Sequence, residues 1–241
     1  MIGNYIADSS WELQRLGKIT SSKCSVLFTD PKSKADKEAG ALAATTRSYL
    51  MENVAEMLTG QFRSLEGIYA LKYGHDQEPY AFEKLGKVYP TMEFFGGENQ
   101  LFLPLTDFSG GSPDSADWDN RLVGEIKCPE NPVNHLENLL LQDEADFEAA
   151  HYDYWCQLQM NMMCVAKKLN VDYMSMKGIF VSYSPSFDEA LQLKIIEVKP
   201  KYFFNMELLT KIEKGTQFMK EVVLKIKKNA ERKKTESTQT A

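Results

Sequence analysis

Apolar residues recur along this chain with two different periods, which divide it into helical and extended segments. A spacing of about three to four residues predicts an amphipathic helix, whereas strict alternation predicts a half-buried strand. The segments with helical spacing are residues 38–58, 64–85, 144–169 and 202–227. Gly60 and Gly86 directly follow the first two of these segments, as is typical of helix C-termini.

The remaining periodic segments predict strands. Residues 88–95 and 101–105 are expected to form a meander, and residues 173–183 and 191–198 an antiparallel pair. Together with the helices, this order predicts an α/β fold with a central mixed β-sheet flanked by helices. Residues 1–228 are expected to form a single domain, and residues 229–241 a basic, polar tail that is disordered.

The N-terminal part combines a short helical pattern with a cluster of hydroxyl groups. Residues 11–17 have helical spacing, and Thr20, Ser21 and Ser22 are candidate N-caps of a second helix. The free amides at that helix start, the hydroxyls and nearby Arg15 would together suit an anion such as phosphate. An ordinary cap beside an exposed arginine produces the same pattern, so the residues alone leave both interpretations open.

Length, charge and cysteine usage restrict the class of protein. The 241 residues fit one large domain, and the net charge of −6 argues against a uniformly basic DNA-binding surface. The four cysteines form no Cys-x-x-Cys pair, which favours reduced thiols in an intracellular protein over a zinc or redox site. No signal peptide and no stretch of membrane-spanning length is found, so a cytoplasmic protein without a membrane partner is expected.

One stretch contains the candidate chemistry, an aspartate followed by a Glu-x-Lys tripeptide. Side chains alternate in a strand, so Glu125 and Lys127 share one face and Ile126 points into the core. A Gly-Gly-Ser-Pro turn precedes Asp114 and is expected to bring its carboxylate alongside Glu125. Two carboxylates and the carbonyl oxygen of Ile126 suit Mg²⁺ or Mn²⁺, and Lys127 would orient or deprotonate a water.

This arrangement predicts a metal-dependent phosphodiesterase, specifically a nuclease. A solvated Glu-x-Lys pair on an ordinary amphipathic strand is the competing interpretation.

Two further polar residues lie on predicted helices. Glu78 is a candidate third acid, although Pro79 behind it predicts a kink or a restart of the helix. Gln157 lies on a polar seam beside the apolar stripe of residues 144–169.

Five separate pieces of the chain resemble one family. Ser112-Pro-Asp114 followed by Glu125-Ile-Lys127 resembles the motif of the PD-(D/E)xK nuclease superfamily. The chain more narrowly resembles phage lambda exonuclease and related YqaJ-type viral recombinases. The pieces occur in the family's order and are Trp11 with Arg15 to Ser22, Tyr73 to Glu83, Ser112 to Asp114, Glu125 to Pro129, and Tyr154 to Gln159.

The resemblance implies a restriction-endonuclease-like core and a role for each matching residue. Asp114, Glu125 and the Ile126 carbonyl match the metal ligands, and Lys127 matches the catalytic lysine. Glu78 and Gln157 match a helix acid and a helix glutamine at the same site. The residues that match a pocket for a 5′-terminal phosphate are Arg15, Ser22, Ser112 and Lys127.

The implied activity is Mg²⁺-dependent 5′→3′ digestion of one strand of linear double-stranded DNA, with Mn²⁺ as a second suitable ion. The 3′ single-stranded overhangs would serve recombination by strand annealing. The implied partners are double-stranded DNA ends, two further copies in a ring-shaped homotrimer, and a single-strand annealing protein. If the chain is phage-encoded, its location is the host cell cytoplasm.

Two alternatives compete with this activity. An endonuclease of the same superfamily, of the restriction or junction-resolving type, would use the same acid–acid–lysine set. A non-catalytic DNA-binding or assembly factor would keep the fold with a decayed site, although the intact set of Asp114, Glu125 and Lys127 argues against it.

Overall fold

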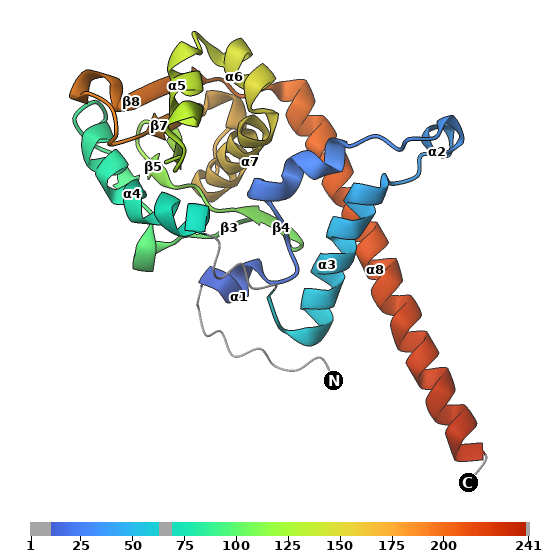
Figure 1. Cartoon of the computed structure of the whole chain (residues 1–241). Coiled ribbons are helices and arrows are strands. Elements are labelled where there is room, and N and C mark those ends of the chain that lie inside the picture. Colours follow the sequence, from blue (N-terminus) through green and yellow to red (C-terminus); the bar gives the residue numbers. More distant parts are fainter. Residues whose placement is uncertain (1–10, 63–68, 240–241) are drawn as a thin grey trace.

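The computed structural model describes residues 11–62 and 69–239, apart from the side chains of Leu71 and residues 233–239. Eight α-helices and eight strands are found in these residues (Figure 1). The helices are α1 Trp11–Arg15, α2 Lys34–Glu38, α3 Ala44–Thr59, α4 Tyr69–Leu85, α5 Pro132–Leu140, α6 Glu144–Ala150, α7 Tyr152–Leu169 and α8 Tyr202–Gln239. Four short 3₁₀ helices accompany them: η1 Ser21–Phe28, η2 Gly97–Asn99, η3 Tyr173–Ser175 and η4 Glu189–Leu191.

The strands form two sheets. They are β1 Ile19–Thr20, β2 Glu93–Phe94, β3 Leu103–Thr106, β4 Ser109–Gly111, β5 Ser115–Asp117, β6 Leu122–Lys127, β7 Lys177–Tyr183 and β8 Leu193–Val198. The larger sheet has the order β2-β5-β6-β7-β8, with β6 and β7 parallel and the other pairs antiparallel. The smaller sheet has the order β1-β4-β3. The mixed α/β architecture expected from the sequence is therefore confirmed.

Strand β6 lies at the centre of the larger sheet and is covered on both faces. Val123 belongs to the core that contains α7, whereas Leu122 and Ile126 belong to a second core with Ala81 and Leu85 of α4. Because side chains alternate along a strand, the odd-numbered residues of β6 face the α7 layer and the even-numbered residues face the α4 layer. Glu125 lies on the same face of β6 as Val123 and points into the α7 layer. Ile126 lies on the opposite face and is buried against α4, as predicted.

Helix α7 is buried nearly all round, which a single apolar stripe does not predict. Every residue from Trp155 to Ala166 is buried, including three polar amides.

The prediction of one continuous helix over residues 144–169 is wrong. His151 has a non-helical backbone (φ −135°, ψ 55°) and separates α6 from α7. Phe147 of α6 is fully buried against Phe180 of β7, so α6 packs on the sheet as a separate helix.

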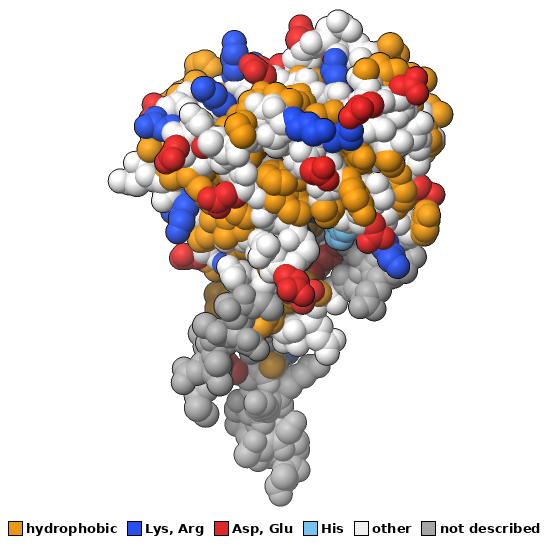
Figure 2. All heavy atoms as spheres, turned by 90° about the vertical axis from the view of Figure 1, so that its left-hand side faces the viewer, with side chains coloured by type: hydrophobic (Ala, Val, Ile, Leu, Met, Phe, Trp, Pro, Cys, Tyr) orange, Lys and Arg blue, Asp and Glu red, His pale blue; other side chains and the backbone are white. Residues whose placement is uncertain are grey.

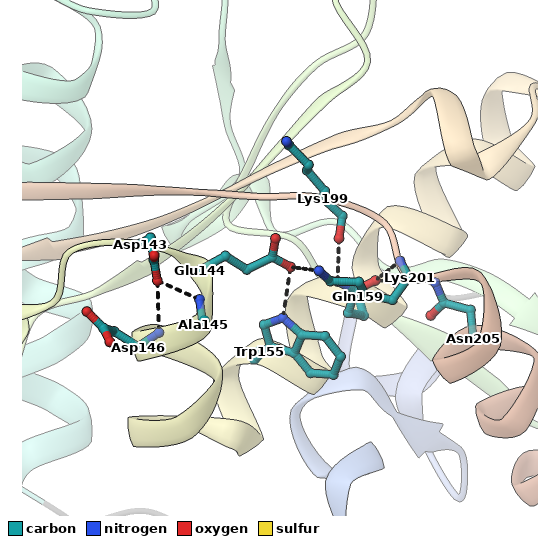
Figure 3. Close-up of polar contacts among 9 residues, drawn as sticks. All are labelled: Asp143, Glu144, Ala145, Asp146, Trp155, Gln159, Lys199, Lys201 and Asn205. Atoms are coloured by element: carbon teal, nitrogen blue, oxygen red, sulfur yellow. Dashed lines mark hydrogen bonds and ion pairs between the residues drawn. The ribbon is translucent and has the colours of Figure 1, made fainter.

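One of the α7 amides fastens the link between β8 and α8 (Figure 3). The Gln159 side chain donates to the carbonyl oxygen of Lys199 at 2.8 Å and accepts from the amide of Lys201 at 3.0 Å. It also accepts from Asn205 Nδ2 at 3.3 Å. Glu144 pairs with Lys201 at 3.2 Å and accepts from Trp155 Nε1 at 3.3 Å, which ties α6 to the same link.

Helix α5 lies in a part of the chain for which the periodicity predicted no helix. Asn131 caps it through a bond from the Val133 amide, and Pro132 occupies the first turn, where a missing N–H is tolerated. The helix buries His135 and Asn138 and exposes its apolar side chains, namely Val133, Leu136 and Leu140. Figure 2 shows the face where α4 lies, and hydrophobic side chains spread across its middle.

Four other details differ from the sequence predictions. The predicted meander is wrong, because β2 pairs with β5 and β3 pairs with β4 in the other sheet. The helix expected after Thr20 is the 3₁₀ helix η1. Helix α4 contains Pro79 without restarting. Helix α8 continues beyond Lys227 to Gln239 and projects away from the body in Figure 1. No helix in the described part of the chain is long and apolar enough to cross a membrane.

Candidate active site

A tight hairpin between β5 and β6 fixes the position of the first acid. The Asp117 carboxylate accepts bonds from the Asn120 amide at 2.9 Å and from its side chain at 2.7 Å, and Arg121 adopts a left-handed conformation (φ 56°). The hairpin register places Asp114 opposite the end of β6, where its Oδ2 accepts from the Ile126 amide at 2.6 Å. The expected alignment of Asp114 with the Glu125–Lys127 segment is therefore present.

Glu125 is fully buried between two donors. Lys127 Nζ lies 2.5 Å from its Oε1, and Asn161 Nδ2 donates to its Oε2 at 3.0 Å. Burial and the neighbouring Asp114 carboxylate raise the pKa of Glu125 to about 8, against the opposing effect of Lys127. Burial also raises the pKa of Asp114, although Lys127 and the Ile126 amide oppose it. A pair of desolvated carboxyl groups therefore lies at this end of β6.

Lys127 provides the positive charge beside these acids. Burial disfavours its ammonium group, but the carboxylates of Glu125 and Asp114 outweigh burial and raise the pKa of Lys127. The Nζ atom also lies 5.1 Å from the centre of the Tyr154 ring. Lys127 is therefore a cation in this arrangement, which suits binding and orienting an anion better than accepting a proton.

The third acid comes from α4. Burial, followed by repulsion from Asp114, raises the pKa of Glu78 to about 7, and Lys127 opposes the shift. Glu78 therefore reaches the site in spite of Pro79 behind it. His75 lies one turn earlier on α4 and borders the same cavities as Glu78.

Two cavities meet at Lys127. The smaller, of about 160 Å³, is bordered by nearly every candidate from the sequence: Arg15, Ser22, Glu78, Ser112, Asp114, Lys127 and Gln157. The larger, of about 610 Å³, lies between α4, α5 and the start of α7, and Ile126 borders it. His75, Glu78 and Lys127 line both. The structure thus brings together residues from four distant parts of the chain.

The smaller cavity is rich in hydrogen-bond donors. The Arg15 guanidinium lies 4.1 Å from the centre of the Trp11 ring, and Trp11 Nε1 donates to Ser112 Oγ at 2.9 Å. Ser22 Oγ lies 3.2 Å from Thr20 Oγ1 at the start of η1. Burial lowers the pKa of Arg15 from its ordinary value, although Tyr49 and Glu56 oppose the shift. A guanidinium, an ammonium and several hydroxyls around one cavity are suited to binding a phosphate.

One residue at the site was not identified from the sequence. Asn161 lies one turn after Gln157 on α7 and contacts Glu125 directly. The available signal was the polar seam on which both amides lie, but nothing in the sequence indicated which amide faces the carboxylate. Gln157 itself is 8% exposed and borders the smaller cavity.

The residues present fit a divalent cation by their chemistry. In the described residues, no group of three or more His, Cys, Asp or Glu side chains is arranged to hold a metal ion. An ion would therefore depend on the carboxylates of Asp114 and Glu125 together with a backbone oxygen, for which the Ile126 carbonyl is the candidate. Burial, followed by repulsion from Asp114, raises the pKa of Glu125, and a hard cation beside its carboxylate would offset both effects.

Comparisons with known proteins identify the family and the fold. Residues 10–168 match the family of the YqaJ-like viral recombinase domain. Among solved structures, the alkaline exonuclease of Laribacter hongkongensis superposes with a TM-score of 0.71 and 21% identity, covering 92% of this chain and 99% of that one. A phage-related exonuclease from Haemophilus somnus 129PT gives a TM-score of 0.68 and 17% identity, covering 87% and 96%. No curated protein matches the sequence. The expected fold class is thereby confirmed.

Proposed function

Because the chain belongs to the YqaJ-like viral recombinase domain family, we propose that it is a metal-dependent exonuclease. It digests one strand of linear double-stranded DNA in the 5′→3′ direction and leaves 3′ overhangs for recombination. The observation that carries the proposal is the smaller cavity, where phosphate-binding donors and the carboxylates of Glu78 and Asp114 border the same space.

The phosphate-binding donors and the acids of this cavity have different proposed roles. Arg15, Ser22 and Ser112 bind the 5′-terminal phosphate by charge-assisted and hydroxyl hydrogen bonds. Because this phosphate is bound beside Asp114 and Lys127, the strand is held with a phosphodiester near the acids. End recognition and cleavage are thereby coupled, which favours a terminal cut over an internal one.

Asp114, Glu125 and the Ile126 carbonyl are the proposed holders of Mg²⁺, with Mn²⁺ as an alternative ion. When bound, such an ion supplies an activated water and stabilises charge on the phosphate oxygens. The ammonium of Lys127 contacts a phosphate oxygen and stabilises the charge that develops there. Gln157 orients the substrate from α7, and Glu78, with a pKa of about 7, exchanges a proton near neutral pH.

The product proposed for this chain is a nucleoside monophosphate. The Laribacter alkaline exonuclease has also been solved in complex with dAMP. A nucleoside monophosphate combines one phosphate with one base. We propose that the same kind of product is released from this chain.

The decisive experiment compares linear duplex DNA with covalently closed circular DNA in the presence of Mg²⁺. The linear duplex should be digested from its 5′ ends while the circle stays intact, and Lys127→Ala should abolish the digestion. Cleavage of the closed circle would instead identify an endonuclease. Binding of DNA without cleavage of either substrate would identify a non-catalytic factor.

The proposed partners follow from the family resemblance and have separate tests. Light scattering coupled to size-exclusion chromatography would reveal a homotrimer as three times the mass of one chain. Co-purification with a single-strand annealing protein from the same genome would test that partner.

A further inference from the structure

Asn161 is a buried amide whose nitrogen makes a hydrogen bond and whose oxygen makes none within the described part of the chain. The residue is fully buried, and its Nδ2 donates to Oε2 of the fully buried Glu125 at 3.0 Å. Its Oδ1 is buried and has no hydrogen-bond partner among the described residues. A buried polar oxygen without a partner costs free energy. Packing alone would therefore be served better by an apolar side chain of the same size.

Gly111 of β4 provides the space for this amide. A Cβ atom at Gly111 would lie 2.2 Å from Asn161 Oδ1, 3.1 Å from Ser21 Oγ and 3.2 Å from Cys164 Sγ. The backbone of Gly111 does not have a positive φ, so its conformation is open to other residues. Glycine is therefore needed at this position because it has no side chain, and not because of its backbone conformation.

The two donors of Glu125 hold its carboxylate from both ends. Lys127 contacts Oε1 on the side of the cavities, and Asn161 contacts Oε2 from the interior of the α7 layer. Lys127 is partly exposed, whereas Asn161 is completely enclosed. The enclosed donor therefore holds one carboxylate oxygen from the interior, while Lys127, which borders both cavities, contacts the other.

We propose that Asn161 is a positioning residue, which orients the Glu125 carboxylate for a divalent cation, and that Gly111 is required to keep Asn161 in place. The inference rests on the proposed metal-dependent function. Groups that orient a metal ligand through a second hydrogen bond commonly change metal affinity when they are removed. Asn161 acts through Glu125 and does not itself touch the substrate.

The test measures Mn²⁺ binding by calorimetry on the whole chain without DNA. Asn161→Leu keeps the branching and the number of side-chain heavy atoms but removes the donor, so the affinity for Mn²⁺ should fall by roughly 10–100-fold. The thermal midpoint of the metal-free protein should change little, because removal of the unpartnered oxygen offsets the loss of the donor to Glu125 Oε2. A purely structural role would give the reverse, with a lower midpoint and unchanged affinity.

Gly111→Ala is the second variant, and it leaves Asn161 chemically intact. The new methyl group displaces the amide end of Asn161, so the affinity should fall in the same direction. Cys164→Ala is the matched control, because Cys164 packs against the same spot without contacting Glu125. Its midpoint should fall slightly, while its Mn²⁺ affinity should equal that of the wild type.

The outcomes separate the inference from the function on which it rests. Equal Mn²⁺ affinity in the wild type and Asn161→Leu would overturn the positioning role. An unchanged affinity in Gly111→Ala would overturn the role given to Gly111. If the wild type bound no Mn²⁺ at all, the metal-dependent function would be wrong, and the inference would fall with it.

Discussion

Gln159 and Asn161 are two buried amides on the same helix, and they differ in how well they are satisfied. Gln159 donates to one backbone carbonyl and accepts from a backbone amide and from Asn205. Asn161 makes one bond, to a carboxylate, and leaves its oxygen unpartnered. Both are fully buried.

The comparison teaches that burial alone does not assign a role to a polar residue. A satisfied amide stabilises the connection between elements, as Gln159 does between α7 and the start of α8. A half-satisfied amide beside a repelling pair of carboxyl groups is a cost to the fold. Such a cost is expected where stability is lost for the sake of function.

The largest effect is expected at the acids. Asp114→Asn should lower nuclease activity by about 10²–10³-fold, which is the range for removal of one preorganised electrostatic group. The metal-free protein should become more stable at pH 8, because a buried ionised carboxylate is removed. The raised pKa values of Asp114, Glu125 and Glu78 mean that ionisation weakens the folded state as pH rises.

Thermal melting in EDTA together with a linear-duplex assay checks both parts of this prediction. The Asn side chain keeps an oxygen that can accept from the Ile126 amide, so the hairpin should be preserved. A variant that was inactive and also clearly less stable would show that Asp114 supports the fold.

Gln159→Leu should lower the stability and leave the activity nearly unchanged, which is the reverse of Asp114→Asn. It leaves the Lys199 carbonyl, the Lys201 amide and Asn205 without their partner, which costs about 3 kcal/mol after relaxation. For a chain of this size that lowers the melting temperature by roughly 6–12 °C. The kcat measured well below the melting temperature should remain near that of the wild type. Asn161→Leu is the matched variant two residues away, and equal melting losses in both would remove the distinction.

Arg15→Ala should act on one substrate only. With a 5′-phosphorylated duplex, kcat/KM should fall by about 10–100-fold, since a hydrogen bond to a charged group is lost. With a 5′-hydroxyl duplex the change should be small. Lys18→Ala is a suitable control, because its ammonium donates to the Asp107 carbonyl and does not border the smaller cavity. Equal losses on both duplexes would contradict the pocket for the 5′ phosphate.

The smallest effect on stability is expected at a buried chain of hydrogen bonds. It runs from His151 through Asn138 and Ser182 to His135. Burial lowers the pKa of His135, and its bond to the Leu191 carbonyl only partly opposes this. The unfolded state therefore binds more protons, so stability is complete above pH 6.5 and declines as pH falls below it.

For one proton the slope is at most about 1.4 kcal/mol per pH unit. Urea unfolding between pH 5.5 and 7.5 measures it. His135→Gln, which can still donate and accept, should flatten the profile. A slope unchanged by this substitution would assign the pH dependence to other groups.

The site could be predicted from the sequence as far as local periodicity extends. Alternation in β6 predicted that Glu125 and Lys127 share a face and that Ile126 is buried, and the β5–β6 hairpin agrees. The pairing of residues 88–105 could not be predicted, because β2 and β3 find partners in different sheets. The contact of Asn161 with Glu125 could not be predicted, because α7 is enclosed on all sides and its polar seam does not show which amide faces the carboxylate.

The sequence by itself determined most of the helices and strands and which residue types stand at the end of β6, because those features depend on backbone geometry over a few residues. Its local patterns could not determine that Arg15 and Ser22 would border the same cavity as Ser112 and Lys127, which only the family resemblance implied. That convergence depends on the packing of α1, η1, α4 and α7 around the sheet. Packing between distant segments is set by the whole hydrophobic core, and only the tertiary structure decides it.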